Sequence, residues 1–308
     1  MKKTGKNIIS ASRRTDIPAF YSEWFMNRIR AGHCVVSNPF NANQVSYVSL
    51  SPRDVHAIVF WTRDPKPLIK YLPELDRKGY KYYFQYTVIG YPESIDPKSP
   101  PIASAVKTFC ELSELIGRDK VVWRYDPILY SNRTPLGWHI KRISYLIERL
   151  KSHTRRMIVS FIDPYRKTRI GMARGAGSGL HLAPDAFEIP AYDRLAGWMG
   201  KKAAAAGLEI QTCAEGVDLE RFGIKHGKCV DNDLIGRFLD VAVSKRKDPS
   251  QRKLCGCVIS KDIGANNTCL FGCRYCYATS SVETAMVNYR KHDPKDPALI
   301  PMRVIVLP

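Results

Sequence analysis

Short apolar segments alternate with longer amphipathic segments along this chain. The apolar segments are rich in β-branched and aromatic residues and predict strands over residues 7–11, 57–61, 82–88, 121–125, 157–162 and 209–213. The segments between and after them predict helices over residues 18–30, 65–77, 101–116, 134–152, 191–206 and 232–244. This alternation predicts an α/β fold with a parallel sheet, in the form of a TIM-like (β/α) barrel, complete or partial. An open doubly wound sheet is the alternative.

The last quarter of the chain differs from the rest. Residues 245–268 are polar and then carry cysteines, so they mark the best candidate for a boundary. We therefore divide the chain into barrel repeats over residues 1–244 and a cysteine-rich segment over residues 245–308. Within that segment, residues 258–263 predict a final strand. We expect this strand to pair with the first strand and to close the barrel.

Composition and charge narrow the class of protein. The chain has 308 residues, of which 44% are apolar, and it contains no apolar run of the roughly 20 residues that would cross a bilayer. We expect a cytoplasmic protein with no membrane partner, whose nine cysteines serve as metal ligands or thiols rather than disulfides. The formal net charge of +19 would attract a polyanion, for which nucleic acid is the candidate. A solvated basic surface is the alternative, since no nucleic-acid-binding motif is present.

Polar residues gather where the predicted strands end. In a parallel barrel these ends meet at one face, where substrates bind. The side chains expected there are Ser12, Arg13, Arg14, Thr15, Asp16, Arg63, Arg124, Asp126, Gln211 and Glu215. They predict a polar mouth of ligand size, whose arginines suit a carboxylate, phosphate or sugar. Arg–Asp pairs that only close the end of the barrel are the alternative.

Cys269, Cys273 and Cys276 follow one another at C-x3-C-x2-C spacing. Three thiolates can bind three irons of a cubane [4Fe–4S] cluster and leave the fourth iron without a protein ligand. Gly272 lets the backbone bend between the ligands, and Tyr275 can shield one side of the cluster. The spacing therefore predicts an iron–sulfur centre with an open iron. A zinc site completed by a fourth cysteine is the alternative.

Four further cysteines could form a second metal site. Cys255 and Cys257 form a Cys-Gly-Cys unit before the triad, Cys213 ends the last barrel strand, and Cys229 follows a basic loop. Such a set could hold zinc or another iron–sulfur cluster. Its spacing is irregular, and packing roles for Cys213 and Cys229 are the alternative.

Five segments together resemble a known family, the domain of unknown function 1848. They are Ser-Ala-Ser-Arg-Arg-Thr-Asp-Ile-Pro (10–18), Val-Phe-Trp-Thr-Arg-Asp-Pro (59–65), Trp-Arg-Tyr-Asp-Pro (123–127), Cys-Ala-Glu (213–215) and the cysteine-bearing run at 255–278. The resemblance covers nearly the whole chain but implies no activity. The cysteine triad with its aromatic residue also resembles the cluster loop of radical S-adenosylmethionine (SAM) enzymes. The short run Cys-Arg-Tyr-Cys-Tyr is similar to the spore photoproduct lyase and DNA repair photolyase group.

The radical SAM resemblance implies a function. Cys269, Cys273 and Cys276 would bind the cluster, and its open iron would chelate SAM, which is cleaved to a 5′-deoxyadenosyl radical. An electron donor such as flavodoxin or ferredoxin would reduce the cluster. The substrate of such an enzyme would be a small molecule or a nucleic acid. The chain departs from the family pattern because it lacks a Gly-Gly-Glu motif after the cluster, and because the cluster loop comes late in the sequence.

A permuted order of strands would explain both departures. If the final strand lies beside the first, the segment from Ser12 to Asp16 occupies the position that contacts SAM. Arg63, Arg124, Asp126, Gln211 and Glu215 would then bind the substrate. The alternative function is a non-catalytic module, stapled by iron–sulfur or zinc, that binds nucleic acid through its basic surface. The number of ligands separates the two, since a catalyst needs an open iron and a staple needs four ligands.

Overall fold

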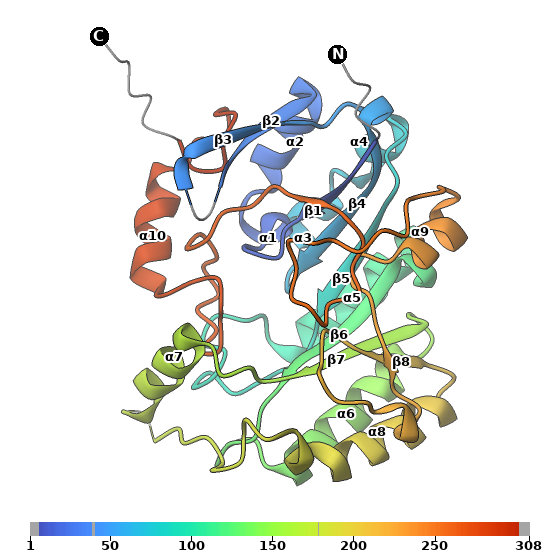
Figure 1. Ribbon diagram of the computed structural model, residues 1–308, viewed down its shortest axis with the longest axis vertical. Coiled ribbons are helices and arrows are strands. Elements are labelled where there is room, and N and C mark those ends of the chain that lie inside the picture. The colour runs from blue at the N-terminus through green and yellow to red at the C-terminus, as the bar shows by residue number, and fades with distance from the viewer. Residues whose placement is uncertain (1–5, 39–40, 178, 302–308) are drawn as a thin grey trace.

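An eight-stranded parallel sheet forms the centre of the protein in a computed structural model that describes residues 6–38, 41–177 and 179–301 (Figure 1). Its strand order is β10-β1-β4-β5-β6-β7-β8-β9, and every neighbouring pair is parallel. The strands are β1 (Asn7–Ala11), β4 (Val55–Thr62), β5 (Tyr82–Thr87), β6 (Val121–Ile128), β7 (Arg156–Phe161), β8 (Glu209–Thr212), β9 (Lys225–His226) and β10 (Lys261–Asp262). The α/β class is confirmed, as is each strand predicted between residues 7 and 213, with small shifts at the ends.

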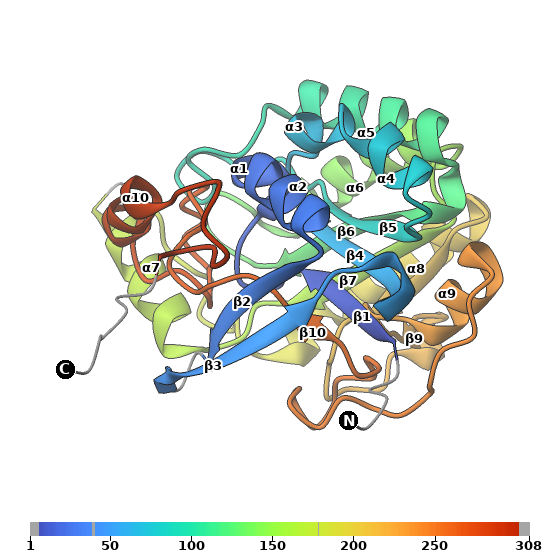
Figure 2. The same ribbon diagram turned by 90° about the horizontal axis from the view of Figure 1, so that it is seen from above.

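Helices cover one face of this sheet (Figure 2). They are α1 (Ile17–Phe20), α2 (Ser22–Ala31), α3 (Lys66–Ile69), α4 (Leu72–Arg77), α5 (Ile102–Ile116), α6 (Leu136–Leu150) and α8 (Asp193–Ala205). In α5, the buried side chains of Ala105, Phe109 and Leu112 recur at the spacing that places them on one face of a helix. That face packs on the side of the sheet that carries Ile9, Phe60 and Phe84 in the same buried cluster.

The predicted helix over residues 65–77 is two short helices, α3 and α4. Pro67 and Pro73 each lie in the first turn of a helix, where the missing N–H costs no hydrogen bond. The helix predicted over residues 18–30 is likewise divided, because Tyr21 leaves the helical conformation between α1 and α2. Within the described ranges, no helix combines the length and the apolar character needed to cross a bilayer.

The other face of the sheet is covered by α9 (Asn232–Leu239) and by the chain that follows it. Ile8, Val59 and Tyr83 of the strands pack against Leu234 of α9 in one buried cluster. The helix predicted over residues 232–244 ends early because Asp240 adopts a left-handed conformation with φ of 53°. The segment from residue 240 to β10 therefore crosses this face as loops.

Some elements were not predicted from the sequence. They are the antiparallel pair β2 (His33–Asn38) and β3 (Asn41–Ser49), the helices α7 (Arg166–Ala176) and α10 (Val282–Lys291), and the 3-10 turns η1 (Pro52–Asp54), η2 (Arg118–Lys120), η3 (Ile189–Tyr192) and η4 (Glu220–Phe222). Of these, α7 and α10 lie on either side of the cysteine loop (Figure 1).

The last strand lies beside the first, as predicted from the order of the motifs. In β10, Lys261 and Asp262 pair with Ile9 and Ser10 of β1. The strand is shorter than the predicted residues 258–263, because the N–H groups of Val258 and Ile259 bond to loop carbonyls instead. The sheet ends at β9 and β10, and no strand pair of the described residues joins these two edges. Of the predicted forms, a complete barrel is therefore not formed by the described strands.

Candidate metal centre

Cys269, Cys273 and Cys276 line one cavity of about 240 Å³ in the loop between β10 and α10. All three are free cysteines. Gly272 lies between the first two with φ of 72°, in the left-handed region that favours glycine. The C-x3-C-x2-C spacing thus forms a turn that brings all three thiols to the same cavity.

The cysteine loop is fixed to distant parts of the chain by hydrogen bonds. The phenol of Tyr21 donates to the carbonyl oxygen of Thr268 at 2.7 Å, and Thr168 of α7 donates to that of Tyr275 at 3.2 Å. The phenol of Tyr277 donates to the carbonyl oxygen of Arg13 at 2.7 Å. The loop is therefore held against the end of β1 and against α7.

A buried cation lies beside the triad. Arg63, which follows β4, forms an ion pair of 2.8 Å with Asp96, and Tyr275 donates to the same carboxylate at 3.0 Å. Burial opposes the charge on Arg63, but Asp96 and the nearby Cys273 raise its pKa well above the ordinary value. Arg63 is thus a permanent positive charge next to the cysteines. Asp96 carried no signal in the sequence, because it lies in a loop without a motif.

The triad supplies the number of thiols that a cubane cluster with one open iron requires. Within the described part of the chain, no group of three or more His, Cys, Asp or Glu side chains could hold a metal ion. A zinc ion draws its ligands to a single atom, whereas the cysteines of a cubane cluster bind different irons around a larger body. Three thiols around one cavity meet the second requirement. The cations Arg63, Lys167 and Arg174 next to it suit the negative charge of such a cluster.

The residues predicted to contact SAM form hydrogen bonds with other residues of the protein. Asp262 of β10 accepts hydrogen bonds from the hydroxyl of Ser12 at 2.6 Å, the N–H of Arg13 at 2.8 Å and the guanidinium of Arg14 at 3.1 Å. Asp262 was not predicted as a site residue, although it directly precedes the cysteine loop. The side chains of Ser12 and Arg14 therefore fix the end of β1 to β10.

Asp16 and Thr15 complete that segment. The Asp16 carboxylate caps α1 by accepting from the N–H of Ala19 at 3.0 Å, and it also accepts from the N–H of Arg63 at 2.6 Å. Burial raises the pKa of Asp16 to about 7, against the effect of these hydrogen bonds. The hydroxyl of Thr15 is buried without a hydrogen-bond partner among the described residues.

Three of the predicted substrate residues gather on the face of the sheet that α9 and the loops after it cover, which we call the inner face. Arg124 pairs with Asp126, and its guanidinium lies over the ring of Trp61 at 5.0 Å. Glu215 accepts from the N–H of Phe161 at 3.0 Å, and burial raises its pKa to about 8. Arg124, Asp126 and Glu215 are thus brought together as the sequence predicted. Arg63 instead lies beside the cysteine loop, paired with Asp96 and next to Tyr275.

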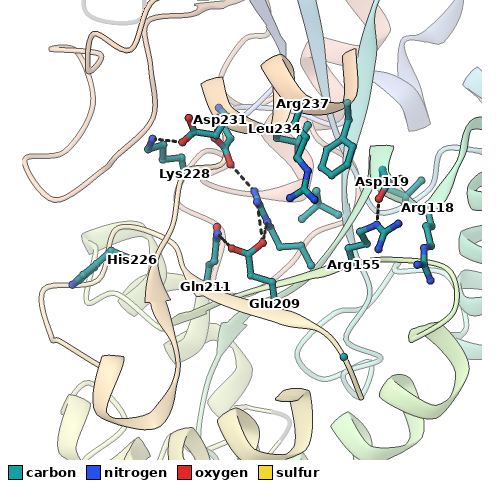
Figure 3. Close-up of a pocket in the computed structure, with 16 residues that line it drawn as sticks. Arg118, Asp119, Arg155, Glu209, Gln211, His226, Lys228, Asp231, Leu234 and Arg237 are labelled. Atoms are coloured by element: carbon teal, nitrogen blue, oxygen red, sulfur yellow. Dashed lines mark hydrogen bonds and ion pairs between the residues drawn. The ribbon is translucent and has the colours of Figure 1, made fainter. Parts of the chain in front are cut away.

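The remaining predicted substrate residue, Gln211, lies elsewhere. It lines a cavity of about 610 Å³ at the amino ends of β6, β7 and β8, where its amide donates to Glu209 at 2.7 Å (Figure 3). Basic side chains also line this cavity, but Arg155 pairs with Asp119, and Arg156 pairs with Glu209. Arg155 and Arg156 are therefore paired within the protein at this cavity.

The four cysteines outside the triad also meet. The sulfur atoms of Cys213 and Cys229 are 3.2 Å apart, and Cys229, Cys255 and Cys257 lie in one buried cluster against which Cys213 packs. Although these four cysteines are irregularly spaced in the sequence, the fold brings them into a single group on the inner face of the sheet.

Comparisons with known proteins identify a family. No curated protein matches the sequence. Among solved structures, the RhlG/NADP active-site complex of Pseudomonas aeruginosa aligns with 68% of this chain and 72% of its own, at 11% identity and a TM-score of 0.26. A short-chain type dehydrogenase/reductase from Mycobacterium marinum aligns with 84% of this chain and 93% of its own, at 9% identity and a TM-score of 0.29. Likeness at this level carries no argument. The family described as "Domain of unknown function (DUF1848)" matches residues 8–278, from β1 through the cysteine loop, and the chain belongs to that family.

Proposed function

We propose that the protein is a radical SAM-like enzyme whose [4Fe–4S] cluster is held by Cys269, Cys273 and Cys276. The observation that carries the proposal is that these three thiols, and no fourth cysteine, line one cavity at the carboxyl end of the sheet. Three ligands leave one iron open, which is what catalysis at the cluster requires. When bound, the cluster and SAM supply a 5′-deoxyadenosyl radical. The protein's own residues bind SAM and the substrate and orient them toward each other.

A permuted strand order supports this function. β10 delivers the cysteine loop and lies beside β1, so the loop stands next to the first strand in space although it comes late in the sequence. Tyr277 bonds to Arg13 just beyond β1. The fold would thus be a partial barrel in which the spatial order of a radical SAM barrel is kept. The segment from Ser12 to Asp16 would then shape the SAM site through its backbone, since most of its side-chain groups are bound to Asp262, Ala19 and Arg63.

Charged side chains around the cavity would hold the two ends of the methionine part of SAM. Lys167 and Arg174 of α7 line the cavity and would meet the carboxylate. Glu283, in the first turn of α10, lines the same cavity and would accept from the amino group. These residues replace the missing Gly-Gly-Glu motif in the proposal.

The substrate would bind over the inner face of the sheet, where Arg124, Asp126 and Glu215 meet. The guanidinium of Arg124 suits an anionic or polar group of a small molecule or of a nucleotide. Trp61 offers Arg13 and Arg124 an aromatic face on which each guanidinium lies, at 5.3 Å and 5.0 Å from the ring centre.

Anaerobic reconstitution tests the proposal. The protein is loaded with iron and sulfide, reduced with dithionite and mixed with SAM, and 5′-deoxyadenosine is measured by chromatography. We expect 5′-deoxyadenosine and a change in the electron paramagnetic resonance spectrum of the reduced cluster when SAM is added. The triple variant Cys269→Ser, Cys273→Ser, Cys276→Ser should yield neither, while Cys110→Ser, a cysteine outside both groups, should yield both.

If adding SAM leaves the electron paramagnetic resonance spectrum unchanged and no 5′-deoxyadenosine forms, the proposal that the protein is an enzyme is overturned. Loss of the triad's iron on changing Cys255 or Cys257 alone would point to a four-ligand staple instead. The alternative, a non-catalytic metal-stapled module that binds nucleic acid, would then be the better description of the protein.

A further inference from the structure

Four cysteines gather over the inner face of the sheet, in segments that adjoin its two free edges. The sheet has two free edges, β9 and β10. Cys213 follows β8, Cys229 follows β9, and Cys255 and Cys257 come just before β10. The segments next to the two edges therefore bring two pairs of thiols toward one another over the inner face, where the main-chain oxygen of Cys229 accepts from Tyr83 and Gln85 of β5.

Contacts join these thiols into one group. Cys213 and Cys229 approach with a sulfur–sulfur distance of 3.2 Å, and Cys257 and Cys255 lie in the same buried cluster as Cys229. The N–H of Val230 donates to the sulfur of Cys257 at 3.3 Å. Cys229, Cys255 and Cys257 are buried, with exposed fractions of 2%, 8% and 2%. Four free thiols thus share one largely dry site.

Two arginines, the buried Arg124 and the half-buried Arg13, lie near the same sulfur atoms. The guanidinium of Arg124 lies 2.8 Å from the sulfur of Cys229, and that of Arg13 donates to the hydroxyl of Ser260, three residues after Cys257, at 3.3 Å. An arginine keeps its charge in a protein, so a buried one needs an anion nearby. Asp262 forms its ion pair with Arg14, whereas the guanidinium of Arg13 donates to the hydroxyl of Ser260, which leaves the positive charge of Arg13 for the sulfur atoms to balance. Negatively charged sulfur, as in metal-bound thiolate, meets this requirement.

We propose that Cys213, Cys229, Cys255 and Cys257 form a closed four-thiolate metal site that joins the β9 edge of the sheet to the β10 edge. The site takes a thiophilic centre, either a zinc ion or an iron–sulfur cluster, and leaves no open position. It does not depend on the function proposed above. Within the described residues no three such side chains could hold a metal ion as they stand, so binding requires the thiols to turn toward a common centre.

The proposed role is structural. Between the segments next to the two edges the chain makes few backbone bonds, among them the N–H of Val258 to the carbonyl oxygen of Val230 at 3.1 Å. A metal with four ligands would supply there the connection that a strand pair supplies elsewhere in the sheet. It would also hold β10, and with it the start of the cysteine loop, against β1.

Metal analysis of matched variants tests the site. The triple variant Cys269→Ser, Cys273→Ser, Cys276→Ser removes the triad and leaves the four-cysteine group intact. Purified anaerobically, it should retain about one equivalent of zinc or about four of iron with sulfide per chain, and these two results identify the centre. The double variant Cys255→Ser, Cys257→Ser should lose that equivalent and keep the iron of the triad. Cys110→Ser serves as the control for both.

A spectroscopic measurement keeps the test open if the double variant fails to fold. If the centre is zinc, cobalt(II) added to the zinc-stripped triple variant should give the intense absorption of tetrahedral cobalt bound by thiolates. If the centre is a cluster, the triple variant itself should show the visible absorption of an iron–sulfur cluster. A triple variant that holds no metal, or whose Cys213 and Cys229 are recovered as free thiols or as a disulfide after native alkylation, overturns the proposal. Neither result bears on SAM cleavage, which is measured with the intact triad.

Discussion

The phenol of Tyr277 donates a hydrogen bond of 2.7 Å to the main-chain oxygen of Arg13. Tyr277 follows the last cysteine of the triad, and Arg13 follows β1, so this bond joins the cysteine loop to the first strand. The guanidinium of the same arginine donates to the hydroxyl of Ser260, between Cys257 of the other cysteine group and β10. Arg13 therefore bonds both to the loop of the triad and to the segment that carries Cys257.

Removing this bond should loosen the triad's hold on its cluster. A hydrogen bond of this kind contributes about 1 kcal/mol, so Tyr277→Phe should release iron to a competing chelator about five-fold more readily than the parent protein. Tyr145→Phe, an exposed tyrosine of α6, is the control and should release iron at the parent rate. Equal iron release from both variants would contradict a role for the Tyr277–Arg13 bond in holding the loop.

The buried ion pair beside the triad should matter far more than an exposed one. Asp96→Asn leaves the charge of Arg63 buried without its carboxylate, and we expect the free energy of unfolding to fall by about 3 kcal/mol. Glu74→Gln makes the same chemical change in the pair with Arg30, where half the arginine side chain is exposed, and should cost less than about 1 kcal/mol. Anaerobic urea titrations of both variants measure the difference. A similar loss in the two variants would show that burial of Arg63 does not govern the energy of its pair.

Much of the fold could be predicted because parallel strands carry a strong local signal. Both faces of β4 and β6 are buried, so each reads as a short apolar run, and the count of such runs indicated the sheet. The adjacency of β10 and β1 followed from the order of the motifs. The gap between β9 and β10 could not be predicted, because each of these edge strands has two residues and carries no periodicity.

The candidate site was predictable only where ligands lie close in sequence. The triad occupies eight consecutive positions, so its spacing alone indicated a cluster. Asp96 and Asp262 act through partners far along the chain, Arg63 and Ser12, and nothing near either aspartate marks it. Gln211 was expected at the polar mouth because it lies on β8, but the fold directs it to the cavity at the other end of the sheet.

Stability should fall in mild acid through His139. This side chain is buried in α6 between the phenol of Tyr125 and the carbonyl oxygen of Leu129, each at 2.9 Å, and burial lowers its pKa to about 4. The unfolded chain binds a proton near pH 6.5, whereas the folded protein resists protonation until about pH 4. The contribution is therefore fully present above pH 6.5 and is lost as the pH falls through this window.

At pH 5 the loss should amount to about 2 kcal/mol relative to pH 7.5. Urea titrations of the parent protein and of His139→Gln at both values check this. The variant lacks the titrating group, so its dependence on pH over this range should be flatter by that amount. Identical slopes for parent and variant would mean that another group governs the acid response.

The packing of α7 against the cysteine loop leads to the sharpest contrast between two similar substitutions. A Cβ atom at Gly171 would lie 2.0 Å from the carbonyl oxygen of Arg274, which is backbone of the loop and cannot turn aside. Gly171→Ala should therefore push α7 from the loop, lower the free energy of unfolding by about 2 kcal/mol and reduce the iron retained by the triad.

Gly137 also lies in a helix, α6, but a Cβ there meets nothing within 4 Å. Gly137→Ala should be neutral, or stabilising by up to about 1 kcal/mol, because alanine favours helix. Iron content and urea unfolding of the two variants decide the matter, and full retention of iron in Gly171→Ala would show that α7 does not support the metal centre.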